Sequence, residues 1–137
     1  MRIVIIEDEV YAAKRLENMI KEFDPGIEIA AWLESVKDSV EWFRNNPNPD
    51  LIFLDIHLED DLSFAIFDKV TVSSPIVFTT ATDDLAIEAF QTKKIDFLHK
   101  PIVKTELVSL LEKYSNPANR KSQPIGTNYF KDLITKK

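Results

Sequence analysis

Short apolar runs alternate with amphipathic segments along most of the chain. The runs are rich in Ile, Val, Leu and Phe, and they lie at residues 2–6, 51–54, 76–78 and 95–98. Runs without polar alternation predict strands that are buried on both faces, as in a parallel sheet. Residues 27–33 instead alternate between strongly apolar positions and weaker ones, which predicts a half-exposed strand at a sheet edge.

Between these strands, apolar residues recur at helical spacing. In the first such segment, Ala12, Leu16, Met19 and Phe23 fall at i, i+4, i+7 and i+11, so they line one face of a helix. Ser35 precedes the second segment and is a candidate N-cap residue. By the same pattern, helices are predicted over residues 10–23, 36–43, 62–70, 85–90 and 107–114.

These elements form five strand–helix units in series. A chain of 137 residues has the size of one domain. Right-handed crossover connections turn such a series into a parallel sheet with helices on both faces. With residues 27–33 at an edge, we predict an α/β fold of the flavodoxin-like class, a (βα)5 doubly wound parallel sheet with strand order 2-1-3-4-5. The pattern ends at Tyr114, so residues 115–137 are predicted to be a linker or tail.

The composition limits the function. The chain carries a net charge of −6, although its tail contains five basic residues and one acid. An acidic body repels nucleic acid, so the folded part is not expected to bind DNA. The absence of cysteine excludes disulfides and thiolate metal sites. The sequence shows neither a signal peptide nor an apolar stretch long enough to span a membrane, so we expect a cytoplasmic protein without membrane contact.

Polar side chains gather at the carboxyl ends of the predicted strands. Glu7 and Asp8 follow the first strand, Asp55 ends the third, Thr80 ends the fourth, and Lys100 follows the fifth. In the order 2-1-3-4-5 these four strands are neighbours, and open α/β sheets bind their ligands at this edge. We therefore expect three carboxylates, a hydroxyl and an amine in one crevice.

Three carboxylates in one crevice repel each other unless a cation neutralises them. With oxygen ligands and no cysteine, the hard cations fit best, Mg²⁺ above all, with Mn²⁺ as an alternative. A carboxylate beside such an ion can act as a nucleophile toward a phosphoryl group and form an aspartyl phosphate. The metal and Lys100 would then offset the charge that develops on the transferring oxygens.

Four sequence strings at these strand ends resemble the receiver domains of two-component response regulators. They are IIEDE, DLIFLDI, FTTA and DFLHKP, which begin at residues 5, 50, 78 and 96. Four such motifs in this order are highly specific. The resemblance implies a receiver domain over residues 1–114, which binds Mg²⁺. Residues 115–137 would then lead toward an output domain that this chain does not include.

Carried over position by position, the resemblance implies a role for each residue of the predicted metal site. Asp55 is the phosphoacceptor and also a metal ligand. Asp8 binds the metal directly, Glu7 binds it through water, and the backbone carbonyl of His57 supplies a third contact.

Three further positions have switch roles by the same resemblance. Thr80 supplies the hydroxyl that moves to the phosphate, Lys100 forms an ion pair with it, and Phe97 is the aromatic switch residue. The peptide bond between Lys100 and Pro101 is expected to be cis. An aromatic residue in an apolar strand is also an ordinary core residue, so Phe97 keeps this second interpretation.

Structural interpretations compete with some of these roles. Asp8 and Asp55 also fit as helix N-caps, since both lie at strand-to-helix junctions. Thr80 fits as a cap for the turn that follows it. His57 and His99 have no third neutral ligand to complete a metal site, so their side chains are predicted to lie at the surface.

The sequence around the phosphoacceptor, FLDIHL from residue 53, resembles receivers that are joined to a LytTR-type DNA-binding domain. In such proteins the receiver controls transcription, and DNA is bound by the separate output domain alone. One departure from many receivers is the loop after Asp55, where Glu59, Asp60 and Asp61 replace the usual Pro and Gly. The turn therefore does not use the conformational freedom of glycine, and it is predicted to add negative charge to the site.

The leading hypothesis is a phosphorylation-controlled signalling switch, phosphorylated on Asp55 by a sensor histidine kinase. Such a domain is not an enzyme beyond its own phosphoryl transfer and autodephosphorylation. Phosphorylation is expected to promote a homodimer through the fourth helix, fifth strand and fifth helix, next to Thr80 and Phe97.

Two alternatives belong to other functional classes. A pseudo-receiver would bind partners without being phosphorylated, but the complete set of site residues argues against it. A small metal-dependent phosphatase would need a separate general acid or substrate pocket, and the sequence shows neither.

Overall fold

A computed structural model gives the structure of residues 1–81 and 95–120, and the description below is confined to these ranges. The helix predicted over residues 85–90 and most of the predicted tail lie outside them. In the described part of the chain, no helix is long and apolar enough to cross a membrane.

Five strands, three α-helices and two 3₁₀ helices make up the described fold. The strands are β1 (Arg2–Ile6), β2 (Glu28–Leu33), β3 (Leu51–Asp55), β4 (Ile76–Thr80) and β5 (Phe97–His99). The α-helices are α1 (Val10–Phe23), α2 (Val36–Asn45) and α4 (Lys104–Ser115), and the 3₁₀ helices are η1 (Ser63–Asp68) and η2 (Pro117–Arg120).

The strands form one parallel sheet in the order β2-β1-β3-β4-β5, so the predicted topology is confirmed. The central strands end at nearly the same level. Asp55 at the end of β3 pairs with Thr79, and Thr80 at the end of β4 pairs with His99. This register brings the polar residues that follow the strands to one edge of the sheet.

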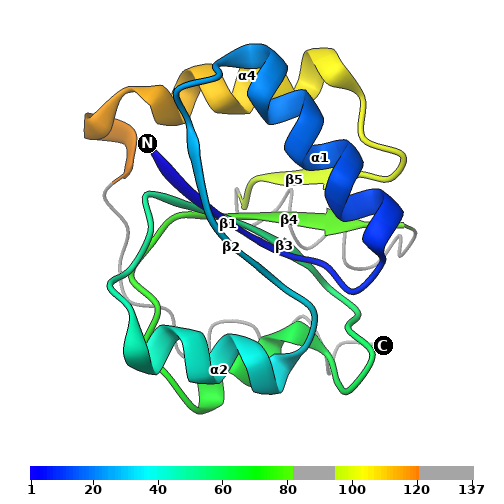
Figure 1. The fold of residues 1–137 in the computed structure, drawn as a ribbon, viewed down its shortest axis with the longest axis vertical. Helices are drawn as coiled ribbons and strands as arrows, with labels where there is room; N and C mark the ends of the chain where they lie inside the picture. The colour runs from blue at the N-terminus through cyan, green and yellow to red at the C-terminus, as the bar shows by residue number, and fades with distance from the viewer. Residues whose placement is uncertain (82–94, 121–137) are drawn as a thin grey trace.

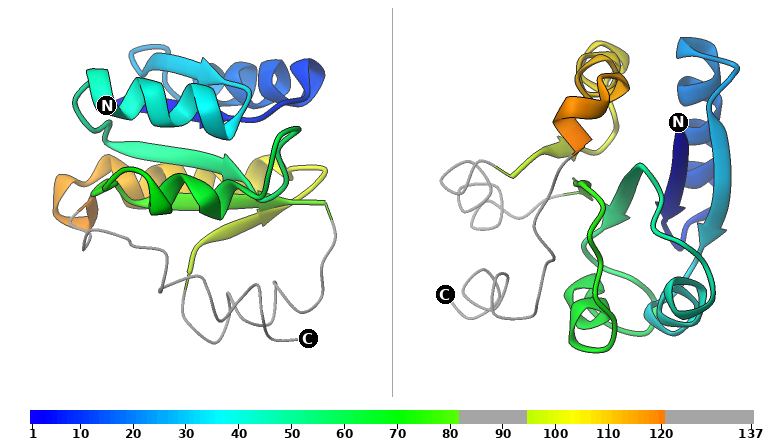
Figure 2. Two further views of the ribbon diagram at one scale, coloured as in Figure 1. Left: turned by 90° about the horizontal axis from the view of Figure 1, so that it is seen from below. Right: turned by 90° about the vertical axis from the view of Figure 1, so that its left-hand side faces the viewer.

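Helices cover both faces of the sheet (Figures 1 and 2). Because neighbouring residues of a strand point to opposite faces, Ile3 and Ile5 pack with α1 and α4, whereas Val4 and Ile6 pack with α2 and η1. Every residue of β3 and β4 is buried, which confirms that the apolar runs predicted strands buried on both faces.

The sequence signals at β2 and α2 are also confirmed. β2 lies at the edge of the sheet, and most of its residues are partly or fully exposed. Ser35 is the N-cap of α2, and its hydroxyl accepts a hydrogen bond from the Asp38 amide at 3.0 Å. This bond satisfies one of the amides that have no partner within the first turn of a helix.

The segment over residues 62–70 differs from the prediction. It forms the 3₁₀ helix η1 (Ser63–Asp68) instead of an α-helix. Phe64, Ile66 and Phe67 are all buried, so the backbone winds tightly to turn three apolar side chains into the core within four positions. The β-branched residues 70–72 that follow favour extended backbone. β5 is also displaced from the predicted residues 95–98 and comprises Phe97–His99.

The described chain continues past the predicted domain end at residue 114. α4 ends at Ser115, and η2 follows it. The Arg120 guanidinium donates to the Tyr114 carbonyl at 2.7 Å and lies 3.6 Å from Asp50 in an ion pair. The division into a domain over residues 1–114 and a linker over residues 115–137 stays a prediction.

Candidate functional site

The three acidic residues predicted for the site lie together at the carboxyl edge of the sheet. Glu7 and Asp8 follow β1, and Asp55 is the last residue of β3. Each offers a carboxylate oxygen, and these oxygens lie within 4.8 Å of one another. Glu7 is 5% exposed, Asp55 is 7% exposed, and Asp8 is half-buried. The N-cap of α1 is Glu9, so Asp8 does not take the alternative role of helix cap.

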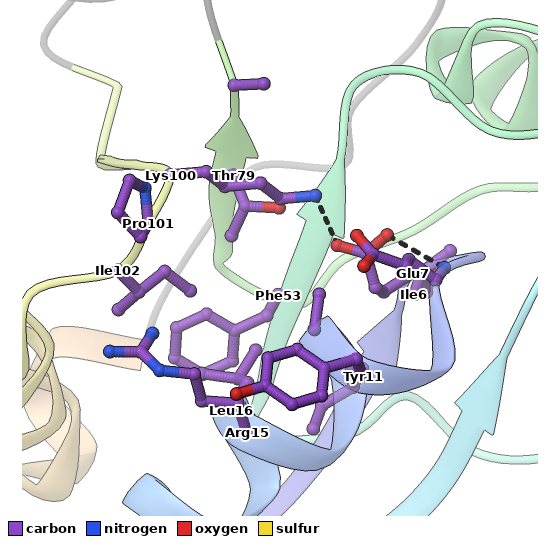
Figure 3. A pocket seen from close by; sticks show the side chains of 14 residues that line it. Ile6, Glu7, Tyr11, Arg15, Leu16, Phe53, Thr79, Lys100, Pro101 and Ile102 are labelled. Atoms are coloured by element: carbon purple, nitrogen blue, oxygen red, sulfur yellow. Dashed lines mark hydrogen bonds and ion pairs between the residues drawn. The ribbon is translucent and has the colours of Figure 1, made fainter.

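Lys100 enters the same crevice from the loop after β5. Its Nζ atom forms an ion pair with Glu7 (Figure 3). It forms a second ion pair with Asp55, 3.2 Å from Oδ2. The Lys100 amide donates to the Thr80 carbonyl at 2.7 Å, which fixes the base of the side chain next to β4. The peptide bond between Lys100 and Pro101 is cis, in agreement with the prediction. The amine pairs with two of the three carboxylates, so the crevice is negative when all three are ionised.

The electrostatics of the crevice favour an additional cation. Desolvation raises the pKa of Glu7, and the charge of Asp55 adds to the shift, although the hydrogen bond from Lys100 opposes it. Desolvation and the neighbouring Glu7 carboxyl also raise the pKa of Asp8. Burial lowers the pKa of the Lys100 amine, but the hydrogen bonds and charges of Glu7 and Asp55 outweigh burial, so the pKa is raised. Keeping the carboxylates ionised therefore costs free energy, and the charge of Lys100 offsets only part of that cost.

The two other predicted switch residues lie on β4 and β5. The Thr80 hydroxyl oxygen is buried at the end of β4 and has no hydrogen-bond partner among residues 1–81 and 95–120. A buried hydroxyl without a partner loses the bonds it would make to water, so it is ready to bond an incoming acceptor. Phe97, the first residue of β5, is half-buried and packs against the core on the α2 side of the sheet. Its packing role is confirmed, and its switch role stays a prediction.

Trp32 supports the site in a way that the sequence did not indicate. It lies in the edge strand β2, opposite Ile5, and its indole nitrogen donates to the Glu7 carbonyl at 2.7 Å. The Glu7 amide donates to the Leu33 carbonyl at 2.9 Å, so β2 holds the backbone of Glu7 on both sides. The sequence feature that could have predicted this contact is a tryptophan, whose N–H needs an acceptor, near the carboxyl end of an edge strand.

The loop after β3 turns two of its acids toward backbone amides. Asp60 accepts hydrogen bonds from Val36 and Lys37, and Asp61 accepts one from the amide of Leu62. These two carboxylates therefore bond amides at the starts of α2 and η1 and are not part of the acidic cluster. The predicted gain of negative charge at the site stays a prediction.

The histidines lie as the sequence predicted. The side chains of His57 and His99 are exposed, and neither is part of the acidic cluster. His57 lies two positions after Asp55, and its backbone forms an isolated antiparallel bridge with Leu62. The predicted metal contact through the His57 carbonyl stays a prediction.

A cavity of about 360 Å³ adjoins the acidic cluster on the α1 side of the sheet. Phe53, Leu16 and Ile102 form its apolar part, and Lys100 and Glu7 border it toward the cluster (Figure 3). Tyr11 lies at its rim and is 74% exposed. The cluster is therefore open to a molecule that approaches between α1 and the loop after β5.

The comparison with protein families accounts for this arrangement. A model of the response regulator receiver domain matches residues 3–112. The chain belongs to the response regulator receiver family. Receiver domains act in two-component signalling, and this receiver has their flavodoxin-like fold.

The chain is similar over most of its length to several curated response regulators and to one solved receiver structure. It is 33% identical over 117 residues to the sensory transduction protein LytT of Bacillus anthracis, covering 83% of this chain and 47% of LytT. It is 32% identical over 116 residues to the transcriptional regulatory protein YpdB of Escherichia coli, covering 82% of this chain and 47% of YpdB. The response regulatory domain of mrkE from Klebsiella pneumoniae has a TM-score of 0.69 and 29% identity, over 84% of this chain and 95% of that domain.

Proposed function

We propose that this receiver is a phosphoacceptor switch in which Asp55 takes a phosphoryl group from a histidine kinase. The observation that carries the proposal is the convergence of three carboxylates, the Lys100 amine and the unpartnered Thr80 hydroxyl at one edge of the sheet. One Asp55 oxygen attacks the phosphorus atom of the donor phosphohistidine. The bond between phosphorus and the imidazole nitrogen breaks, and the imidazole leaves with the bonding electrons.

The donor set of the crevice fits Mg²⁺, and Mn²⁺ has the same preference for oxygen. The available ligand atoms are carboxylate oxygens, which these hard cations prefer. The three carboxylates carry more negative charge than Lys100 can neutralise. Asp8, Asp55 and the His57 carbonyl would hold the ion directly, and Glu7 would hold it through water. When bound, the ion supplies positive charge for the oxygens of the transferring group.

Lys100 and Thr80 contribute to the proposed transfer and to the switch. The Lys100 amine already lies 3.2 Å from Asp55, so it can pair with a phosphate formed on that carboxylate. Pairing with the phosphate would take the Lys100 amine away from Glu7. A bound divalent cation would then supply the positive charge that Glu7 loses. The Thr80 hydroxyl is buried without a partner in the described part of the chain, so it can bond a phosphate oxygen. Its movement toward the phosphate would vacate space on the sheet face that it shares with Phe97, which pairs with Phe78 two positions before Thr80.

The partner of this site is a sensor histidine kinase that docks at the rim of the cavity. Three of the four large apolar side chains that are exposed in the described structure, Val10, Tyr11 and Val103, lie at the start of α1 and just before α4. Tyr11 lines the cavity beside the acidic cluster, and Val10 and Val103 are sequence neighbours of the lining residues Glu9 and Ile102. These side chains suit an apolar partner surface that delivers a phosphorylated side chain.

For the output of the switch, the lengths of the curated relatives are informative. The chain spans about half the length of the curated relatives it matches. By likeness to LytT and YpdB, we propose that phosphorylation controls transcription through a separate LytTR-type domain that binds DNA. The receiver itself remains a cytoplasmic signalling module and turns over no substrate other than its own aspartyl phosphate.

The test of this function is phosphorylation by a small donor. Incubated with acetyl phosphate and Mg²⁺, the protein should gain the mass of one phosphoryl group, measured by intact-mass spectrometry. In excess EDTA the adduct should fall to background, because the acidic cluster then repels the incoming anion. No adduct in Mg²⁺ or Mn²⁺ would favour the pseudo-receiver, whereas equal labelling in EDTA would contradict the metal site.

Phosphorylation should also promote dimerisation. The proposed surface comprises β5, α4 and residues 83–94, of which the last lie outside the described structure. Light scattering at tens of micromolar protein should show a rise toward twice the mass when beryllofluoride and Mg²⁺ are added. Asp55→Asn, which cannot bind beryllofluoride in the same way, is the control. An unchanged mass for the wild type would contradict this surface.

A further inference from the structure

The carboxylate of Asp60 joins two segments that are far apart in the sequence. Its Oδ1 atom accepts a hydrogen bond from the Val36 amide at 2.9 Å, and Oδ2 accepts one from the Lys37 amide at 3.1 Å. Desolvation raises the pKa of Asp60, but hydrogen bonds from backbone amides, those of Val36 and Lys37 foremost, outweigh it and hold the pKa below its usual value. Asp60 is therefore a charged acceptor at the N-terminus of α2, where the helix dipole favours an anion.

α2 does not depend on Asp60 for its own cap. The Ser35 hydroxyl accepts from the Asp38 amide, and the Ser35 carbonyl accepts from the Ser39 amide at 3.0 Å. Asp60 bonds the two amides that Ser35 leaves without a partner. The helix can thus begin at Val36 without Asp60, whereas this carboxylate gives the loop after β3 its hydrogen bonds to α2.

The loop that carries Asp60 is a closed turn built without glycine or proline. The Leu58 amide donates to the Asp61 carbonyl at 3.1 Å, and the Ser63 amide donates to the Ile56 carbonyl at 2.8 Å. The same turn contains His57, through its bridge with Leu62. A displacement of the turn relative to α2 therefore moves the backbone of His57 as well.

We propose that Asp60 is a positioning residue of the phosphoryl-transfer site, which ties residues 57–61 to α2 and thereby fixes the His57 backbone next to the acidic cluster. The proposal rests on the proposed function, which assigns the His57 carbonyl to the metal. Mg²⁺ tolerates little departure from octahedral geometry, so a ligand on a loosely held loop weakens its binding. Asp60 thus restrains a loop that contains neither Pro nor Gly in this chain.

Two variants and a control test the tie in the metal-free protein. Asp60→Ala removes both acceptors, and Asp60→Asn keeps the shape of the side chain but removes its charge. Amide hydrogen exchange at Val36 and Lys37 should accelerate by roughly 10-fold or more in Asp60→Ala, as expected when charge-assisted hydrogen bonds are lost. Glu59→Gln removes a neighbouring charge from the same loop, and it should leave exchange at these amides unchanged.

The second measurement is the dissociation constant for Mg²⁺, from titration calorimetry of the same proteins. It should rise roughly 10-fold in Asp60→Ala, the effect typical of residues that orient metal ligands, and by less in Asp60→Asn. Glu59→Gln should bind like the wild type. At saturating Mg²⁺, labelling of Asp55 in Asp60→Ala by acetyl phosphate should recover, because Asp60 does not touch the reacting atoms.

The outcomes separate this proposal from the function beneath it. Faster exchange with unchanged Mg²⁺ affinity would make Asp60 a structural link only and overturn its positioning role. Unchanged exchange in Asp60→Ala would overturn the tie itself. If the wild type bound no Mg²⁺, the proposed function would be wrong, and so would the positioning role of Asp60. The exchange result would still report whether Asp60 holds the loop to α2.

Discussion

Replacing Asp55 with Asn should abolish phosphorylation of the receiver. In the wild type, the Asp55 carboxylate lies within 4.8 Å of two further carboxylates and 3.2 Å from the Lys100 amine, where it is the reacting group of the proposed transfer. An amide is not a competent nucleophile toward phosphorus. Intact-mass spectrometry after incubation with acetyl phosphate and Mg²⁺ should therefore show no adduct on Asp55→Asn above background.

The chain offers a matched control for this loss. Asp61 is an aspartate of the same loop region, and its carboxylate accepts a hydrogen bond from Leu62 instead of joining the acidic cluster. Asp61→Asn should keep labelling close to that of the wild type. A phosphate adduct on Asp55→Asn, or loss of labelling in Asp61→Asn alone, would move the phosphoacceptor to a different residue.

The sheet could be predicted from the sequence because its strands are buried on both faces. Continuous apolar runs such as residues 51–54 leave little choice of structure, and the weaker alternation at residues 27–33 marks the edge strand. The helical type of η1 could not be predicted in the same way. Its apolar residues fit an α-helical stripe, and the tight packing of Phe64 and Phe67 in the folded core decides for the 3₁₀ form.

The acidic cluster could be predicted because topology brings the strand ends together. Once β1 and β3 are neighbours, Asp8 and Asp55 must lie close. The supporting contacts of Trp32 and Asp60 depend on side-chain directions in loops and edges, which no sequence period specifies. Asp60 lies five residues after Asp55, so the sequence alone suggested that it belongs to the site. In the structure its carboxylate instead accepts hydrogen bonds from the two amides at the start of α2.

The second large effect concerns Lys100. Lys100→Met keeps an unbranched apolar stem but removes the amine that pairs with Glu7 and Asp55. Because these carboxylates are buried, the loss of their partner should lower the free energy of unfolding by about 3–5 kcal/mol at neutral pH without metal. Urea denaturation in EDTA measures this loss. Lys104→Met removes an exposed pair with Glu22 and should change stability by no more than about 0.5 kcal/mol.

The dependence of this loss on pH identifies its cause. The pKa of Glu7 is raised in the fold, so its contribution to stability is present below its usual value of 4.5 and is lost as the pH rises through the folded pKa. Without Lys100 the pKa of Glu7 rises further, because the hydrogen bond and the charge that lower it are gone. The penalty of Lys100→Met should therefore be small near pH 4 and should grow toward pH 7.

Saturating Mg²⁺ should reduce the penalty of Lys100→Met at pH 7. An ion that binds only the folded state stabilises it by an amount that grows with the logarithm of its affinity. Removing the lysine leaves a more negative cluster for the ion to bind. The free energy of unfolding, measured in urea with EDTA and with Mg²⁺, should thus rise more for the variant than for the wild type. If Lys100→Met lowered the free energy of unfolding equally at pH 4 and pH 7, and Mg²⁺ did not change this loss, packing of the lysine stem would be its cause. The charges of Glu7, Asp55 and Lys100 would then not determine the stability of the crevice.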